Sequence, residues 1–305
     1  MSHRSLRRTL SAYQVGRYDP TTRLSAGRFV HATLTPEGPG TLLLTWCNDP
    51  APPAECQLQA DAWGPGAGWL LAQAAGMTGL DDPPFDAGLS FPDAPAVVLR
   101  ALRATRTTRL GASNNLYHLL LPTVIAQRIT GGEAIRQWGR LCQRLGEPAP
   151  GPAEVVGDLR LPPAASALVG RPAWWFHPLG IETKRARTLT QVARHASKYW
   201  DWCQAGSANV AHKLGLLSGV GPWTVGSVLG PALGDPDAVP VGDFHFPNIV
   251  AWNLAGEARG DDDRMLELLA PYAGQRGRVL HALTHAGQRA PAFGPRVRLL
   301  PIRHL

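Results

Sequence analysis

A short glycine-containing segment has the residue types that suit phosphate binding. Gly219-Val220-Gly221 follows an apolar stretch, and Pro222, which suits the first position of a helix, comes directly after it. Glycines without side chains allow the backbone to approach a ligand closely. The unpaired N–H groups at the start of the following helix would form an anion site for one phosphate group. An ordinary connection between two helices explains the same residues, because G-x-G alone is a weak signal.

An aspartate 22 positions after Gly221 is the second candidate. Asp243 lies in the segment Val241-Gly242-Asp243-Phe244-His245, beyond an apolar helix and a loop. A carboxylate at this place could stabilise a developing positive charge or orient an attacking water molecule. It could equally serve as the N-cap of a helix that begins near Phe246.

Together the two segments resemble the helix-hairpin-helix DNA glycosylase superfamily. The hairpin has the form L-x-G-V-G-x-W-T from Leu217 to Thr224, and Asp243 follows it at the start of a helix. The closest resemblance is to the bacterial 3-methyladenine DNA glycosylase II branch. Residues 122–130 look like that family's I-x-x-Q-x-x-S/T helix, and residues 179–186 look like the start of its next helix. The resemblance covers residues 110–290 well and the first hundred residues only in outline.

The resemblance places Asp243 on the family's catalytic aspartate. Trp223 falls where bifunctional relatives carry a Schiff-base lysine, which implies a monofunctional enzyme without lyase activity. Relatives with an iron–sulfur cluster have four clustered cysteines after the catalytic segment, whereas no cysteine follows Cys203 here. We therefore expect no iron–sulfur cluster, no other cofactor and no divalent metal. A monovalent cation is implied only by the resemblance, at the carbonyls of Gly215, Leu217 and Val220.

The resemblance also implies which residues contact DNA. Gln127 and Arg128 fall where the family inserts side chains into the gap left by a flipped base, although the branch often has a leucine there. The strand itself would be held at the hairpin, by Gly219, Val220, Gly221 and Thr224.

Aromatic faces would receive the flipped base, and Trp223 is the first candidate. Trp174, Trp175 and Phe246 are further candidates, with core packing as the alternative for the two adjacent tryptophans. Stacking contributes about 1–3 kcal/mol per base, and a cationic alkylated base gains up to roughly 2 kcal/mol from an indole face. The family's aromatic residue in the final core helix is missing from the matching stretch, Val279–Leu283. The pocket must therefore be built differently.

These residues predict a monofunctional DNA glycosylase that excises alkylated purines such as 3-methyladenine, by hydrolysis of the N-glycosidic bond in base excision repair. Its partner would be double-stranded DNA that contains damaged bases, and we expect a monomer. Two alternatives stay open: a non-catalytic protein that binds damaged DNA, which would not need Asp243, and a glycosylase for deaminated or oxidised bases. A neutral base needs more help to leave. His245 is a candidate acid for that step, although an exposed histidine at a helix start is the simpler interpretation.

The charge balance agrees with a nucleic-acid partner. The 305 residues include 30 lysines and arginines against 23 acids, a net charge of +7. A basic chain favours a polyanion, although a composition rich in Ala, Gly, Pro and Arg would produce the same balance. The N-terminus has no apolar run after its arginines, and the uncharged stretch Leu214–Gly234 is rich in glycine. We therefore expect no membrane segment and a cytoplasmic, nucleoid-associated protein.

The elements that must position these residues are mainly helical. Apolar residues from Leu116 to Ile129 recur mostly at spacings of three to five, which predicts a helix that Pro122 would break or kink. Gly131-Gly132 is expected to end it. Many short helices with short loops between them indicate a helical bundle. Further helices are expected over Trp69–Ala75, Glu133–Leu145, Glu182–Ala196, Gly206–Leu216, Trp223–Leu229, Phe246–Leu254, Asp263–Leu269 and Arg276–Thr284.

The first hundred residues have a different pattern. The β-prone runs Arg28–Thr35 and Thr41–Cys47 are joined by turn residues, and a third strand is expected near Cys56–Leu58. The predicted fold is mainly α: a helical bundle with a helix-hairpin-helix motif, preceded by a small α/β domain with an antiparallel sheet. We expect domains over residues 1–96 and 97–288 and a basic C-terminal extension over residues 289–305.

Overall fold

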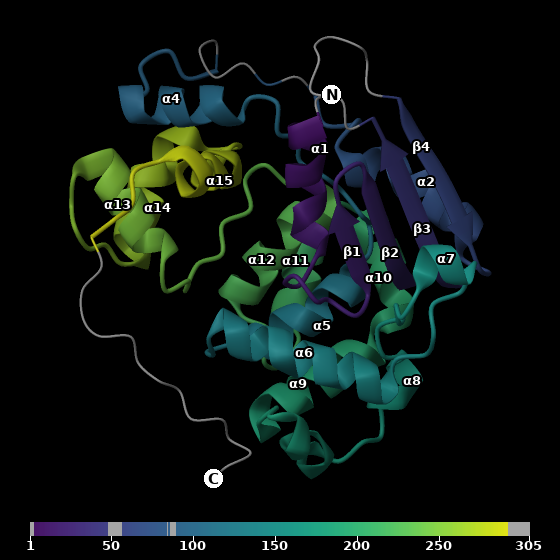
Figure 1. The fold of residues 1–305 in the computed structure, drawn as a ribbon. Helices are drawn as coiled ribbons and strands as arrows, with labels where there is room; N and C mark the ends of the chain where they lie inside the picture. The colour runs from purple at the N-terminus through teal and green to yellow at the C-terminus, as the bar shows by residue number, and fades with distance from the viewer. Residues whose placement is uncertain (1–2, 48–56, 84, 86–89, 292–305) are drawn as a thin grey trace.

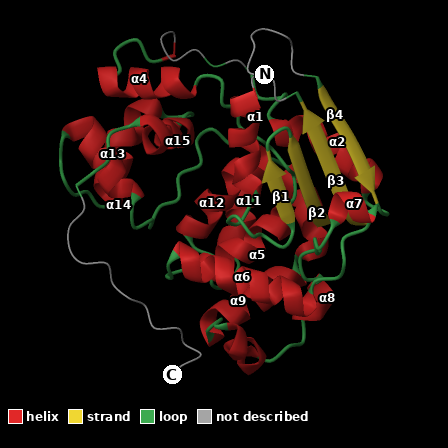
Figure 2. Ribbon diagram, viewed as in Figure 1, coloured by secondary structure: helices red, strands yellow, loops and turns green. Residues whose placement is uncertain are grey.

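The computed structural model describes residues 3–47, 57–83, 85 and 90–291, and it confirms the predicted mainly helical fold with one small antiparallel sheet (Figures 1 and 2). Most of the predicted basic extension, residues 292–305, lies outside the described residues. The predicted domain boundaries stay a prediction, but the buried side chains show which elements share a core.

The sheet is a four-stranded antiparallel meander. Its strands pair in chain order: β1 (Thr22–Ser25), β2 (Arg28–Thr35), β3 (Gly38–Trp46) and β4 (Leu58–Trp63). The predicted hairpin is thus confirmed as β2–β3, and Gly38 begins the second strand because its φ of +122° suits the end of the turn. Two helices, α1 (His3–Leu10) and α2 (Ala67–Thr78), pack with the sheet around Leu10, Phe29 and Leu42.

The third strand was predicted too early in the chain. Within the described residues it begins at Leu58 and pairs with β3 as far as Trp63, whereas Cys56 lies outside the described residues. Gln59 and Asp61 in this strand have little strand propensity. Pairing with β3 therefore stabilises the strand despite the low strand propensity of these residues.

A first cluster of helices packs around α5 (Leu116–Ala126). This helix contacts α6 (Gly131–Leu145), α9 (Thr183–Arg194) and α12 (Pro222–Leu233), and Pro122 lies inside it without ending it. The expectation that Gly131-Gly132 ends the preceding helix is wrong, because both glycines belong to the first turn of α6, which Thr130 caps. The remaining members are short: α7 (Ala153–Val156), α8 (Ala165–Leu168), α10 (Tyr199–Gln204) and α11 (Ser207–Gly215).

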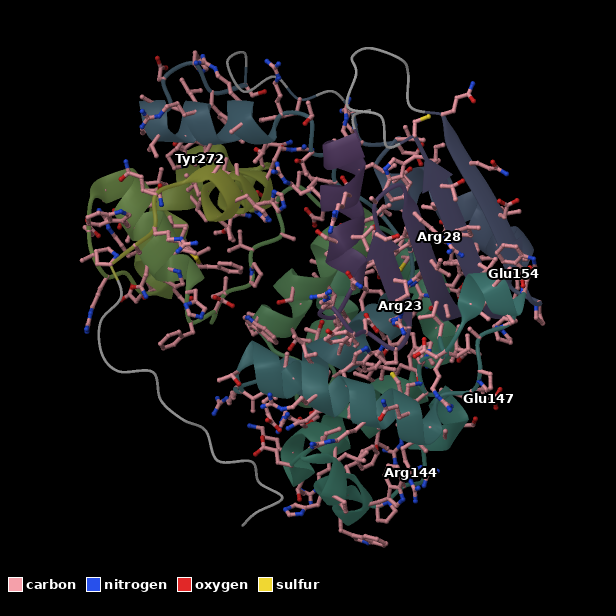
Figure 3. The ribbon with its side chains drawn as sticks, viewed as in Figure 1. Arg23, Arg28, Arg144, Glu147, Glu154 and Tyr272 are labelled. Atoms are coloured by element: carbon pink, nitrogen blue, oxygen red, sulfur yellow. The ribbon has the colours of Figure 1, made fainter. Side chains whose placement is uncertain are left out.

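A second cluster joins segments that are far apart in the chain. Helix α4 (Ala96–Thr105) packs against α15 (Arg276–Ala286) and α13 (Phe246–Ala255), and α14 (Asp262–Leu269) completes the group. Buried Tyr272, labelled in Figure 3, lies in the core of this cluster. The helices of the cluster stand apart from the sheet in Figure 1. The predicted helical region over residues 97–288 therefore contains two hydrophobic cores.

A buried polar network connects the sheet to the first cluster. Asp19 accepts the indole N–H of Trp138 on α6 at 3.1 Å, and Nδ1 of His118 on α5 lies 2.7 Å from the hydroxyl of Thr33 on β2. The ring of His118 stacks on that of His31, with centroids 4.6 Å apart. At the outer end of the sheet, Arg28 donates to the carbonyl of Glu154 on α7, and both residues are labelled in Figure 3. These contacts fix the sheet relative to the helices.

In the part of the chain that the structure describes, no helix combines the length and apolar character needed to cross a bilayer. The uncharged stretch Leu214–Gly234 is divided between the end of α11, the hairpin and α12.

Candidate active site

Trp223 and Asp243 are in direct contact. The indole Nε1–H of Trp223 donates to Oδ2 of Asp243 at 3.0 Å. The backbone N–H groups of His245 and Phe246 donate to Oδ1 at 2.8 and 3.1 Å. A carboxylate offers about four lone-pair positions, and these contacts use three of them. One position on Oδ2 is therefore left for a water molecule or a substrate, and the side chain is partly exposed.

Of the two roles considered for Asp243 from the sequence, the structure shows the capping contact, and the catalytic role stays a prediction. The carboxylate accepts from the N–H of His245, just before α13, and from the N–H of Phe246, its first residue, as an N-capping side chain does. The positive end of the helix dipole also lies there, and it favours the ionised carboxylate. The cap fixes the orientation of the carboxylate, so that the same contacts that begin the helix also position a candidate catalytic group.

The hairpin between α11 and α12 requires glycine at one position. Gly219 has a φ of +86°, and an added Cβ would lie 2.0 Å from Oγ1 of Thr188 on α9. At Gly221, by contrast, an added Cβ would have no described atom within 4 Å, and the residue is exposed. The first glycine is needed for packing, and the second leaves the start of α12 open to a ligand.

Gln127 connects the hairpin to the end of α5. Its Nε2 donates to the carbonyl of Gly219 and to Oγ1 of Thr224, both at 2.9 Å. The side chain of Thr224 is only 2% exposed, so its hydroxyl serves this contact and not the surface. Insertion of Gln127 into DNA stays a prediction, and in this structure the residue holds the hairpin.

Arg128 has a backbone that is uncommon for its residue type. Its φ of +58° is in the left-handed region, and its side chain is exposed in the loop between α5 and α6. Such conformations cluster at functional sites. Phe244, next to Asp243, is 84% exposed, and Leu216 on the hairpin is 68% exposed. Exposed apolar side chains beside the glycine turn suit contact with another molecule.

A pocket of about 240 Å³ is lined by close neighbours of the Trp223–Asp243 pair, although neither of these two residues lines it. Phe246, whose N–H donates to Asp243, lines it, as does Ser227, whose hydroxyl donates to the carbonyl of Trp223 at 2.7 Å. Gly230 on α12 also lines it, and segments distant in the chain contribute Arg8, Thr9, Arg109, Leu280, His281 and His285. The volume admits a single nucleobase.

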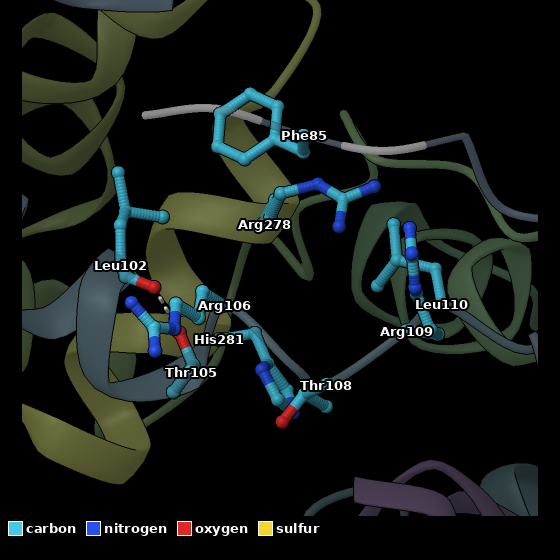
Figure 4. Close-up of a pocket in the computed structure, with 9 residues that line it drawn as sticks. All are labelled: Phe85, Leu102, Thr105, Arg106, Thr108, Arg109, Leu110, Arg278 and His281. Atoms are coloured by element: carbon cyan, nitrogen blue, oxygen red, sulfur yellow. Dashed lines mark hydrogen bonds between the residues drawn. The ribbon is translucent and has the colours of Figure 1, made fainter. Parts of the chain in front are cut away.

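A smaller neighbouring pocket of about 20 Å³ shares one wall with this one (Figure 4). His281, Thr108 and Arg109 line both. Burial, His285 and the arginines Arg8 and Arg278 lower the pKa of His281 to about 4. Its imidazole is therefore neutral near pH 7.

Only one of the four predicted base-pocket residues, Phe246, lines this pocket; Trp223 lies near it without lining it, and the other two lie elsewhere. Trp174 and Trp175 belong to the 3₁₀ segment Ala173–Leu179, which packs on α6 and α9, and neither lines the described pocket. Trp174 is 72% exposed, and the guanidinium of Arg171 lies 4.2 Å from the ring centroid of Trp175. Trp175 also packs against the first core, which agrees with the alternative of core packing.

The monovalent cation at the hairpin carbonyls stays a prediction. The carbonyl of Leu217 accepts the N–H of Val220 at 3.0 Å, and a carbonyl oxygen keeps a second lone pair for a cation. Within residues 3–47, 57–83, 85 and 90–291, no group of three His, Cys, Asp or Glu side chains could share a metal ion.

Sequence reasoning missed the residues of the far pocket wall. His281 and His285 are four positions apart on α15, so they lie on one face of that helix. That spacing in an otherwise apolar helix was the available signal. Arg8 and Arg109 carried no such signal, because only the folded chain brings α1 and the loop after α4 to the pocket.

The arrangement of elements matches solved DNA glycosylases. The chain is similar to the 3-methyladenine DNA glycosylase of Archaeoglobus fulgidus, with 15% sequence identity and a TM-score of 0.70 over 90% of this chain and 92% of that one. It is also similar to the 8-oxoguanine glycosylase/lyase of Clostridium acetobutylicum in its apo form, with 10% identity and a TM-score of 0.64 over 89% of this chain and 90% of that one. The same Clostridium enzyme in complex with double-stranded DNA gives 12% identity and a TM-score of 0.60, with 89% of each chain covered.

A search of protein-family models finds no match for the sequence, and a search of curated proteins finds none either. At the identities above, the structural likeness shows the fold. The chain has the helix-hairpin-helix DNA glycosylase fold, as the sequence predicted. The closer resemblance to the glycosylase II branch stays a prediction.

Proposed function

We propose that this protein is a monofunctional DNA glycosylase that hydrolyses the N-glycosidic bond of a damaged base in double-stranded DNA. The observation that carries the proposal is the Asp243 carboxylate, held by Trp223 Nε1–H at 3.0 Å beside the pocket of about 240 Å³. The glycine hairpin at the start of α12 lies next to this pair along the chain. We propose further that the protein acts as a cytoplasmic, nucleoid-associated monomer in base excision repair.

The hairpin binds the backbone of the DNA strand. Gly221 is exposed and has space around it, and the N–H groups that follow it begin α12. These groups donate to one phosphate, and exposed Arg128 lies one residue after Gln127, which holds the same turn. Flipping of a base from the duplex costs a few kcal/mol and less for a damaged pair. The contacts to phosphate and the pocket offset this cost.

Asp243 stabilises the sugar as its base departs. Breaking the N-glycosidic bond leaves positive charge on the deoxyribose. A carboxylate about 4 Å away, at an effective dielectric constant near 20, stabilises that charge by roughly 4 kcal/mol, which is on the order of a thousandfold in rate. The free lone-pair position on Oδ2 accepts a hydrogen bond from the attacking water and can take its proton.

The absence of a lysine from the site defines the reaction type. The three lysines of the sequence are Lys184, Lys198 and Lys213. They lie on or beside α9 and α11, whereas Trp223 contacts Asp243. Without an amine at that place no Schiff base with the sugar forms, so the product is an abasic site in an unbroken strand.

The sequence favours alkylated purines such as 3-methyladenine as substrates. One structural observation favours a second class of substrate, deaminated or oxidised bases. The described lining of the pocket contains one phenyl ring, that of Phe246, together with two histidines and two arginines. A deaminated or oxidised base carries carbonyl groups, and arginine and histidine N–H groups donate to such acceptors.

A panel of duplexes, each with one lesion, tests the proposal. The protein should release a base from at least one duplex, and strand breaks should appear only after treatment with alkali. Breaks without alkali would contradict the monofunctional mechanism. Binding to lesions without release from any duplex would support the alternative of a damage-binding protein.

A further inference from the structure

The wall of the pocket formed by α15 carries imidazoles at the place where a carbocyclic aromatic ring would favour a cationic base. The rings of His281 and His285 lie with centroids 4.1 Å apart and planes tilted by 32°, and both side chains line the pocket. Nδ1 of His285 lies 2.9 Å from the backbone carbonyl of His281, so the helix backbone holds the ring of His285. The ring of His281 lines both this pocket and the smaller pocket that Figure 4 shows.

The imidazole of His281 is available to a ligand. Among the described residues, neither of its ring nitrogens has a hydrogen-bond partner, although the side chain is partly buried. A neutral imidazole has one N–H donor and one acceptor nitrogen. Burial and the neighbouring arginines keep the pKa of His281 near 4, so it offers both functions over the whole physiological range of pH.

The charges around the pocket are unfavourable to a cation. Arg8 is held at the mouth by a hydrogen bond from its Nη1 to the hydroxyl of Thr108, at 3.2 Å. Arg109 donates to a backbone carbonyl, that of Asp82, so no carboxylate pairs with it among the described contacts. The one acid in the described lining is Asp235, whose carboxylate accepts the N–H of Asp237 at 2.8 Å.

From this wall we infer that the pocket selects an uncharged purine lesion, such as hypoxanthine or 1,N6-ethenoadenine, over a cationic N-methylated purine, and that His281 is the residue that sets this preference. The inference rests on the proposed function. A cationic base would meet Arg8 and Arg109 and would gain little from cation–π contact, since Phe246 is the sole phenyl, phenol or indole ring in the described lining. An uncharged base instead receives a hydrogen bond from His281 on a carbonyl oxygen or a ring nitrogen.

The hydrogen bond supports the departure of a neutral base. When the bond from C1′ to the base breaks, its electron pair leaves with the base, and the N–H of His281 donates to the acceptor on which that charge gathers. The oxygen of water forms the new bond to C1′ and loses one proton to Asp243. The base takes one proton from solvent and Asp243 later returns its proton to solvent, so that water is the one co-reactant.

The test compares single-turnover release from duplexes with hypoxanthine, 1,N6-ethenoadenine or 7-methylguanine at one position. The wild-type protein should release at least one of the uncharged bases at least tenfold faster than 7-methylguanine. His281→Phe, which keeps a ring and removes both nitrogens, should slow release of the uncharged bases at least tenfold and leave 7-methylguanine unchanged or faster. His281→Gln, which restores a donor, should recover part of that loss.

Two further variants keep the test decisive. Arg8→Gln removes a positive charge from the pocket lining. It should speed release of 7-methylguanine relative to the uncharged bases, and this result does not depend on whether His281→Phe folds. His195→Asn is the matched control: Nδ1 of His195 lies 3.0 Å from the carbonyl of Gln191 at the end of α9, as Nδ1 of His285 does from that of His281, and His195 does not line the described pocket. Its selectivity should equal that of the wild type.

The outcomes distinguish failure of the inferred substrate preference from failure of the proposed glycosylase function. If wild-type protein releases 7-methylguanine faster than both uncharged bases, and His281→Phe scales all three rates equally, the inference is overturned and the glycosylase function stands. If wild-type protein releases none of these three bases, the inference is overturned, and the proposed function is contradicted as well only if no duplex of the wider lesion panel loses its base.

Discussion

At the scale of single residues, one carboxylate has a structural role and is also the group to which we assign the chemistry. Asp243 accepts the first N–H groups of α13 and the indole N–H of Trp223. The helix fixes one oxygen, and the indole fixes the other. The remaining lone pair of Oδ2 therefore points to a defined place, as an electrostatic catalyst requires.

Trp223→Phe separates the hydrogen bond from the aromatic face. The variant keeps a ring at the start of α12 and removes the donor to Oδ2. A hydrogen bond to a charged group contributes about 1.5–3 kcal/mol, so we expect base release to slow by about ten- to a hundredfold while DNA affinity is retained. Single-turnover kinetics and a binding titration at fixed salt measure the two effects. Unchanged kinetics would show that Asp243 does not depend on the indole.

The sequence predicts this pair because each residue lies beside a local signal. Trp223 follows the glycine turn, and Asp243 comes just before the start of a helix. The same reasoning fails for Trp174 and Trp175. Aromatic character alone does not say where a side chain lies, and these two belong to a 3₁₀ segment that packs on α6 and α9.

At the scale of elements, three helices hold the hairpin. Thr188 on α9 lies against Gly219, and Gln127 at the end of α5 donates to the carbonyl of Gly219. Gln127 also donates to Thr224 in the first turn of α12. The hairpin is therefore fixed by contacts within the protein, and if it binds a phosphate as we propose, less entropy is lost on binding.

Gly219→Ala tests how strictly the turn is fixed. The left-handed backbone disfavours alanine by roughly 1–2 kcal/mol, and the added Cβ overlaps Thr188. We expect a lower midpoint of thermal unfolding and weaker binding to all DNA sequences alike at fixed salt. Adding Thr188→Ala should restore part of the stability.

The matched control for this change is Gly139→Ala. Gly139 lies in the middle of α6, and an added Cβ there would have no described atom within 4 Å. Alanine favours a helix over glycine by about 1 kcal/mol, so stability should rise and DNA binding should stay the same. Equal behaviour of the two variants would mean that the hairpin is not constrained by Thr188.

The long helices follow from their apolar spacing, and the observed bounds of α9 and α11 to α15 lie within a few residues of those predicted. Short elements escape such reasoning. β1 has only four residues, and β4 begins after a segment outside the described residues, so both depend on pairing with their neighbours for their identity.

At the scale of the whole molecule, the candidate site lies where distant parts of the chain meet. The pocket takes Arg8 from α1, Arg109 from the loop after α4 and His281 from α15. No periodicity along the sequence relates these positions. The sequence could therefore predict Phe246 as a pocket residue, from its place beside Asp243, but not the opposite wall.

The junction between sheet and helices makes stability depend on pH. Burial lowers the pKa of His31 to about 4 and that of His118 well below its usual value. Both are neutral when folded, so their contribution is fully present above about pH 6.5 and is lost as pH falls through the folded values. Each could remove up to about 2 kcal/mol between pH 6.5 and pH 5. Burial raises the pKa of nearby Asp19, which acts in the opposite direction.

The variant His118→Gln isolates one of these groups. Glutamine keeps polar atoms near the hydroxyls of Thr21 and Thr33, which His118 contacts, but it cannot titrate. The free energy of unfolding of the variant should fall less between pH 7 and pH 5 than that of the wild type. Parallel pH profiles for the two proteins would count against a neutral buried His118.

The central claim is that Asp243 performs the chemistry and not the binding. Asn is as good an N-cap as Asp, so Asp243→Asn should leave α13 and DNA affinity intact. The direct measurement is single-turnover base release by wild type and variant, on the lesion duplex that the wild type processes fastest, beside a binding titration on the same duplex. We predict equal affinity and a fall in the rate of release on the order of a thousandfold. Equal rates of release by the two proteins would contradict the account.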